Sequence, residues 1–374
     1  MWSVADARVD ALAWSVRPVP WRPHLLRSVR STLLAAVAVS AVLAGALAGG
    51  GSAVAAPMWP VPAPYPSTSE PVETLAGIPV GSEYVALGDS YSAGYGLTDP
   101  TRLPTAACGQ SARDYPHRIA ARFGLALTDV TCAGATSKDV TTGFQFKGVP
   151  PQIRSLSERT RLVTLTIGGN DADLFGTAGS CLALSAKGPV FSGRDAPSCR
   201  STLVQDGEDQ LGAKIESRVA LGIADTLAAI RAAAPNAVVV FLGYPAIFPD
   251  ADHTPKGGCF RSALDLGTLT GSFPSNTYPF TNTDVRYLHS VQERLNDVSA
   301  TAARAAGVRF VDVFSTTQAH SACATKKPYV SGVSLDGTGD LRRIDLEPGA
   351  LHPNTRGVAY LTKRVAAATR ALAG

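Results

Sequence analysis

Short apolar runs alternate with longer helix-like stretches along most of this chain. The apolar runs are 84–87, 125–131, 162–167, 238–242 and 308–313, and the helix-like stretches between or after them are 115–123, 208–234, 284–306 and 354–372. The run 238–242 is apolar at every position, which is typical of a strand covered on both faces. Strand–helix–strand order makes successive strands parallel, with helices packed on both faces of the sheet. The chain is therefore expected to be an α/β protein built on a parallel five-stranded sheet.

The composition excludes several other classes of protein. Of 374 residues, 45% are hydrophobic and 17% are charged, which excludes a disordered chain, a collagen and a coiled coil. The net charge is +4, and five Arg against two Asp place +3 of it within residues 1–55. Because the remainder is close to neutral, nucleic acid is not expected as a partner.

The first part of the chain has the three-part pattern of a secretory signal. The segment 33–48 is apolar apart from Ser40, follows two arginines, and leads into small residues that end at Ala55. This pattern predicts export, with cleavage after Ala55 and residues 1–26 as a long leader. The alternative is a membrane anchor, in which an uncleaved signal would tether the chain. The apolar segment is shorter than the roughly 20 residues that a spanning helix needs.

Two further boundaries follow from the composition. Residues 1–55 are assigned to the signal and leader, 56–82 to a proline-rich linker, and 83–374 to the folded domain. The prolines favour an extended, semi-rigid chain over helix or central strand.

The six cysteines all follow the predicted signal. An even number in an exported chain predicts three disulfides, and the absence of a close Cys-x-x-Cys pair gives no indication of a zinc site. Six cysteines allow fifteen connectivities. Pairing of sequence neighbours is the hypothesis: Cys108–Cys132, Cys181–Cys199 and Cys259–Cys323.

A serine follows the first predicted strand in the sequence Gly88-Asp89-Ser90. The carboxyl end of a parallel strand is where α/β sheets bind ligands, so that Ser90 is a candidate nucleophile. The alternative is an ordinary turn in which Ser90 caps a helix. No Gly-x-Ser-x-Gly motif occurs, and Asp99 stands where the dinucleotide fingerprint needs its third glycine.

Three more candidates follow other predicted elements. Gly134 lies in a turn after the second strand, and Asn170 follows the third strand, where its amide can donate to an oxyanion. His352 precedes the last helix and can accept a proton from a serine. Taken alone, Asn170 also suits a tight turn and His352 an exposed loop. Two long loops, 172–206 and 244–283, are expected to form walls of a binding site.

Together these four residues, in this order, carry a resemblance to a family. The chain resembles the SGNH (GDSL-type) hydrolases over about residues 83–372, and its six cysteines are most similar to the secreted three-disulfide actinobacterial lipase/esterase branch. The resemblance implies a three-layer, flavodoxin-like α/β/α fold with strand order 2-1-3-4-5. In that order the fourth and fifth strands are neighbours, and the loops that follow them carry Cys259 and Cys323.

The resemblance also implies a mechanism and a location. Ser90 would attack an acyl ester, His352 would move the proton, and the N–H groups of Ser90 and Gly134 with the Asn170 amide would form the oxyanion hole. The expected substrate is a small-molecule or lipid ester. No cofactor or metal is expected, and the protein is expected to be a monomer, secreted or held in the cell envelope. The remaining histidines, His24, His117, His253, His289 and His320, are assigned no role.

One position departs from the family pattern. Most members carry Asp three residues before the histidine, where this chain has Gly349. A backbone carbonyl in residues 349–351 is the expected partner of His352, since it can hold the imidazole tautomer although it lacks a full negative charge. Glu347 is the stronger rival and Asp345 the weaker one.

Two other functions compete with an acyl esterase. A carbohydrate O-deacetylase would be favoured by a Trp-rich cleft, but Trp59 in the linker is the only tryptophan after the predicted signal. A non-catalytic envelope-binding protein would be expected to have lost some of the four residues of the pattern, and all four are present.

Overall fold

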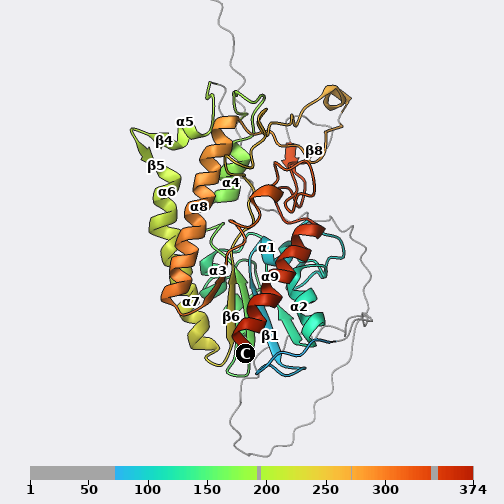
Figure 1. The fold of residues 1–374 in the computed structure, drawn as a ribbon, viewed down its shortest axis with the longest axis vertical. Coiled ribbons are helices and arrows are strands. Elements are labelled where there is room, and N and C mark those ends of the chain that lie inside the picture. The colour runs from blue at the N-terminus through green and yellow to red at the C-terminus, as the bar shows by residue number, and fades with distance from the viewer. Residues whose placement is uncertain (1–71, 192–194, 271, 338–343, 374) are drawn as a thin grey trace, which may run out of the picture. The chain divides into compact units, whose positions relative to one another are not determined.

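The structure is a computed structural model that describes residues 72–191, 195–270, 272–337 and 344–373 (Figure 1). The predicted signal, and the linker up to residue 71, lie outside the described residues. Within the described part, no helix combines the length and the apolar character needed to cross a membrane.

A parallel five-stranded sheet forms the centre of the domain. Its strands are β1 (Glu83–Gly88), β2 (Ala126–Asp129), β3 (Leu162–Thr166), β6 (Val238–Leu242) and β7 (Arg309–Val311). They lie in the order β2-β1-β3-β6-β7, and every neighbouring pair is parallel. This confirms the predicted order 2-1-3-4-5.

Helices cover both faces of this sheet. Figure 1 shows α2 (Tyr115–Phe123) and α9 (Thr355–Ala373) on one side, and α7 (Ala220–Ala233) and α8 (Asn282–Ala305) on the other. Residues of β1 alternate between the two layers. Tyr84 and Ala86 belong to the α2/α9 layer, whereas Val85 and Leu87 belong to the α7/α8 layer. All four are buried, which explains why the strand shows an apolar run instead of an alternating pattern.

The smaller elements lie mostly in the loops. They are α1 (Ser90–Ala93), α3 (Ser137–Thr141), α4 (Leu174–Ser180), α5 (Arg200–Leu203), β4 (Val204–Gln205), β5 (Glu208–Asp209), α6 (Gln210–Lys214), β8 (Leu335–Gly337) and β9 (Ile344–Leu346).

The long helix predicted over 208–234 is more complex than expected. It begins at Gln210, because the Asp209 carboxylate accepts from the N–H groups of Leu211 and Gly212 and caps it. A π-helical stretch, Ile215–Val219, then joins α6 to α7. The first two residues of the predicted range pair instead in the β4–β5 hairpin.

Three disulfides connect the loops in the predicted pattern. They are Cys108–Cys132, Cys181–Cys199 and Cys259–Cys323. The last joins the loop after β6 to the loop after β7, as the strand order requires.

The end of the proline-rich segment packs against the α2/α9 layer. Leu75 and Ile78 are buried with the side chains of that layer. The Glu73 carboxylate forms ion pairs with Arg122 of α2 and Arg370 of α9. Residues 72–82 therefore contact the domain that the sequence places at 83–374.

Candidate active site

Ser90 is the first residue of α1, directly beyond the end of β1. The Asp89 carboxylate caps this short helix by accepting from the Tyr91 N–H at 3.0 Å. Gly88 has φ +128°, and a Cβ there would lie 2.4 Å from the Thr166 carbonyl oxygen of β3. Only glycine allows β1 to turn this close to its neighbour, and the turn brings Ser90 to the carboxyl end of the sheet.

The structure brings Ser90 and His352 into hydrogen-bonding contact although 262 residues separate them. His352 Nε2 lies 2.8 Å from Ser90 Oγ, and His352 Nδ1 lies 2.7 Å from the Ala350 carbonyl oxygen. Since a carbonyl only accepts, Nδ1 carries the proton and Nε2 is the acceptor for the Ser90 hydroxyl.

The loop before His352 disfavours a side chain at position 349. Gly349 has φ +90°, and a Cβ there would lie 3.2 Å from Gly96 Cα. Glu347 and Asp345 are both exposed. Among the described residues, neither of their carboxylates hydrogen-bonds His352, whose Nδ1 partner is the Ala350 carbonyl.

The other two residues of the pattern follow the strands on either side of β1. Gly134, with φ +81°, lies in the turn after β2, and Asn170 follows β3. Asn170 Nδ2 donates to the Ala135 carbonyl oxygen at 2.9 Å, which holds the amide beside the Gly134 turn. Within the described part of the chain, the backbone N–H groups of Ser90 and Gly134 donate to no other residue. These N–H groups and the second Asn170 hydrogen are thus left as donors for an anion.

Aromatic rings enclose His352. Phe175 stacks on the imidazole at a centroid distance of 5.0 Å, and Tyr91 and Tyr95 lie at 4.9 and 5.3 Å. Burial lowers the pKa of His352 to about 4, and the Ala350 carbonyl opposes this shift. The imidazole is therefore neutral at neutral pH and able to accept a proton.

A buried tyrosine links the Ser90 loop to the Asn170 loop. The Tyr244 hydroxyl donates to the Asp89 carboxylate and accepts from the Gly169 N–H at 2.9 Å. Burial raises the pKa of Asp89 to about 7, while the hydrogen bond from Tyr244 opposes that shift. The sequence analysis gave Tyr244 no role of its own. Tyr244 stands two residues beyond the end of β6, at the same edge of the sheet as Ser90, and this position in the sequence could have identified it as a residue near the site.

An apolar pocket adjoins these residues. On the side of the site it is lined by Gly169, Phe175 and Tyr244. The remaining lining residues are apolar apart from Gln292: Leu174, Ala178, Leu211, Ile247, Phe248, Leu288, Val291, Gln292 and Leu295. Residues 174–178 and 244–248 come from the two long loops that were expected to form walls of a binding site.

Comparisons with known proteins identify the family of this chain. Residues 86–360 match the model of the GDSL-like lipase/acylhydrolase family. The chain is 39% identical to "Lipase 2" of Streptomyces coelicolor over 243 residues, which cover 64% of this chain and 72% of that protein. It is 30% identical to "Esterase" of Streptomyces scabiei over 359 residues, or 90% and 94% of the two chains.

Two solved structures share the fold. Phospholipase A1 from Streptomyces albidoflavus matches with a TM-score of 0.55 at 24% identity, over 77% of this chain and 99% of that one. An extracellular lipase from Streptomyces rimosus matches with a TM-score of 0.53 at 23% identity, over 77% and 100%. The fold, the family model and the curated relatives agree, and the chain belongs to the GDSL-like lipase/acylhydrolase family, the SGNH hydrolases, as a carboxylic ester hydrolase.

Proposed function

We propose that this protein is a secreted esterase or lipase that cleaves acyl esters with a Ser90–His352 dyad. The observation that carries the proposal is the continuous chain of contacts from Ser90 Oγ through the two imidazole nitrogens to the Ala350 carbonyl. In each contact the donor and the acceptor are arranged as transfer of the Ser90 proton to His352 requires.

In the first half of the reaction, His352 Nε2 takes the Ser90 proton while Oγ attacks the ester carbonyl carbon. The resulting oxyanion accepts from the N–H groups of Ser90 and Gly134 and from the Asn170 amide. Donors of this kind contribute about 3–4 kcal/mol each to the stability of the transition state. The imidazolium then protonates the leaving alkoxide, and the acyl group stays on Ser90.

In the second half, His352 takes a proton from water, and the hydroxide formed attacks the acyl-enzyme. The tetrahedral intermediate collapses and Ser90 recovers its proton from Nε2. The Ala350 carbonyl holds the same ring orientation through both halves, because it accepts from Nδ1–H whether the imidazole is neutral or charged.

The lining of the neighbouring pocket favours an acyl chain over a sugar. Apolar side chains of α4 and α8 form half of its lining, and one of them, Phe175, also stacks on His352. An alkyl chain would gain about 0.8 kcal/mol for each methylene buried there. The names of the relatives, lipase and esterase, agree with this substrate class. A carbohydrate O-deacetylase remains the second candidate on this fold.

The location proposed is outside the cytoplasm. The three disulfides require an oxidising compartment, which supports export by the segment before Ala55. In this proposal residues 1–55 are removed, 56–82 link the domain to its surroundings, and the domain works as a monomer.

Hydrolysis of p-nitrophenyl esters of increasing chain length by the purified protein tests the proposal. We expect higher kcat/KM for longer acyl chains than for acetate, and a fall in kcat of about 10³-fold or more for Ser90→Ala. Ser92→Ala is the matched control. Ser92 lies in the same short helix as Ser90, but its hydroxyl contacts Tyr115 instead of His352. Ser90→Ala activity above about a tenth of wild type would contradict the nucleophile, and a preference for acetate would favour the deacetylase.

A further inference from the structure

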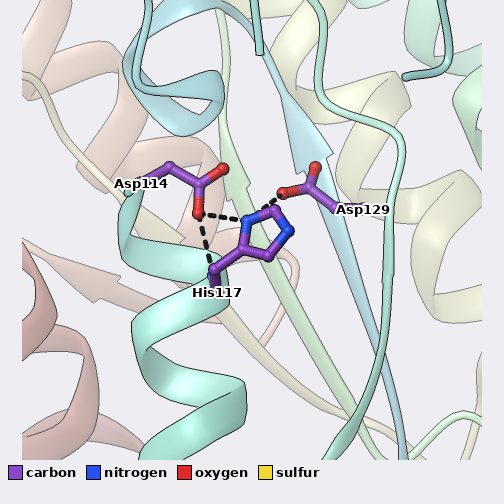
Figure 2. A group of neighbouring side chains, drawn as sticks. All are labelled: Asp114, His117 and Asp129. Carbon is purple, nitrogen blue, oxygen red and sulfur yellow. Dashed lines mark hydrogen bonds and ion pairs between the residues drawn. The ribbon is translucent and has the colours of Figure 1, made fainter. Parts of the chain in front are cut away.

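Outside the active site, a buried histidine lies against two carboxylates. His117 Nδ1 is 2.7 Å from Asp114 Oδ1 and 3.5 Å from Asp129 Oδ2 (Figure 2). Asp114 and His117 come from the start of α2, and Asp129 is the last residue of β2. The Asp114 side chain is fully buried, and those of His117 and Asp129 are 9% and 4% exposed.

The hydrogen bonds that orient each carboxylate go to one of its two oxygens. Asp114 Oδ1 accepts from the His117 N–H at 2.8 Å and so caps α2. Asp129 Oδ1 accepts from Gln110 Nε2 at 2.8 Å and from the Thr131 N–H at 3.0 Å and hydroxyl at 2.6 Å. The second oxygens, Oδ2 of Asp114 and of Asp129, are buried and accept no hydrogen bond from any residue that the structure describes. For Asp129 Oδ2, the contact with His117 Nδ1 at 3.5 Å is an ion pair.

This arrangement needs either a cation between the carboxylates or a proton on one of them. Unpaired buried carboxylate oxygens are strongly destabilising, and two such side chains close together repel each other. A metal ion removes both penalties. One ligand atom from each residue lies within 4.8 Å of the other two. Ligands at about 2.0–2.1 Å from a zinc ion are about 3–3.5 Å apart, which the Nδ1–Oδ1 and Nδ1–Oδ2 distances of 2.7 and 3.5 Å bracket.

We propose that Asp114, His117 and Asp129 bind a divalent cation of the zinc class. An imidazole with two carboxylates suits Zn²⁺ better than Ca²⁺ or Mg²⁺, which prefer ligand sets made of oxygen. Binding displaces the proton of His117 Nδ1 into solvent, as for any histidine ligand. The hydrogen bonds from Gln110 and Thr131 orient Asp129 as the outer partners of metal ligands do.

The cation would join the start of α2 to the end of β2, close to the helix that carries Ser90. Ser111 N–H donates to the Ala93 carbonyl oxygen of α1 at 2.8 Å, and the Tyr115 hydroxyl contacts Ser92 Oγ at 2.9 Å. The role proposed is structural. The ion stabilises the segment against which α1 packs and takes no part in ester cleavage.

The experiment measures zinc on the purified, untagged chain. After dialysis against micromolar Zn²⁺ and gel filtration, we expect about one Zn²⁺ per chain by elemental analysis. Zinc at about a hundred times its Kd should raise Tm by about 5 °C, whereas Ca²⁺ at the same concentration should not. Wild-type protein that binds no zinc and shows no shift in Tm would overturn the proposal, because the carboxylates would then hold a proton.

Two variants show where the zinc binds. Asp129→Asn and Asp114→Asn should each weaken zinc binding about 100-fold or more and abolish the shift in Tm. Asp114→Asn preserves the helix cap, since Asn caps as well as Asp does. The control is Asp250→Asn, because Asp250 and His253 form the same Asp-x-x-His contact on the surface. Loss of zinc from the control, or its retention by both test variants, would contradict this site.

Discussion

Two histidines of this protein are buried to the same extent, but one has uncharged partners and the other lies against carboxylates. His352 is 8% exposed and His117 is 9% exposed. His352 contacts Ser90 and a backbone carbonyl, whereas His117 contacts two carboxylates. A search for Asp–His pairs would have selected His117 and missed His352. In this fold contact with the proposed nucleophile, Ser90, identifies the proposed catalytic histidine, and a carboxylate partner does not.

The sharpest test of that comparison removes each histidine in turn. His352→Ala should lower kcat about 10⁴-fold or more, because Ser90 then has no base. His117→Gln should change kcat by less than about tenfold, or 1.4 kcal/mol in activation free energy. Both are measured on folded protein with one p-nitrophenyl ester. Similar losses in the two variants would mean that the buried carboxylates take part in catalysis.

The acid limb of the pH profile tests whether burial without a carboxylate partner determines the pKa of His352. His352 must be neutral to accept the Ser90 proton, so that kcat/KM falls as pH drops through its pKa of about 4. At pH 5 we expect kcat/KM within about twofold of its neutral value, where a pKa of 6.5 would give a loss of about 30-fold. A limb near pH 6.5 would contradict the lowered pKa.

Asp89 also titrates, and its effect on the pH profile has to be distinguished from that of His352. Burial raises the pKa of Asp89 to about 7. Asp89→Asn removes this group while keeping a side chain able to cap α1. If His352 alone sets the limb, the profile of this variant should show the same midpoint as wild type.

The sheet and the four residues of the family pattern were predictable because they depend on local signals. Parallel strands end at one edge of a sheet, so residues just beyond strands 1, 2 and 3 converge whatever their separation in sequence. The disulfide between Cys259 and Cys323 followed from the same order. The strand order itself came from the resemblance to the SGNH hydrolases. Given that order, these predictions needed only the place of a residue relative to the end of a strand or, for His352, to the start of the last helix.

What the sequence did not show depends on side-chain packing between distant segments. Tyr244 and Phe175 are ordinary apolar positions until the fold places them beside Asp89 and His352. His117 was assigned no role although Asp114 lies three residues before it, because its second partner, Asp129, reaches it only through the packing of α2 on β2. The π-helical stretch Ile215–Val219 likewise has no sequence signal, since nothing in its sequence, Ile-Glu-Ser-Arg-Val, distinguishes it from an ordinary α-helical turn.

Giving His352 a carboxylate of its own should fail in this loop. Gly349→Asp places an L-residue at φ +90° and a Cβ 3.2 Å from Gly96 Cα. Positive φ costs about 1–2 kcal/mol, so we expect Tm to fall by a few degrees and kcat not to rise. Gly207→Asp is the control, because Gly207 has φ +83° with open space around it. A rise in kcat for Gly349→Asp would show that the site lacks only the acid.

The smallest expected effect is the most informative about how His352 is held. If Glu347 were the acid of a triad, Glu347→Gln should lower kcat about 10²-fold or more. Glu347 is exposed, and its backbone N–H is tied to the Ser334 carbonyl at 2.9 Å, while Ala350 accepts from His352. We therefore expect kcat within about threefold of wild type, or 0.7 kcal/mol in activation free energy.

Asp345→Asn completes this test, because Asp345 is the remaining acidic rival and is also exposed. Both variants should keep the acid limb of wild type, since neither carboxylate contributes to the pKa of His352, which burial and the Ala350 carbonyl determine. A large fall in kcat with an unchanged Tm would mean that the loop rearranges on substrate binding to bring a carboxylate to Nδ1. An unchanged kcat in both would leave the backbone as the partner of the imidazole, with burial keeping His352 neutral, so that the contrast with the carboxylate-flanked His117 holds during turnover as well.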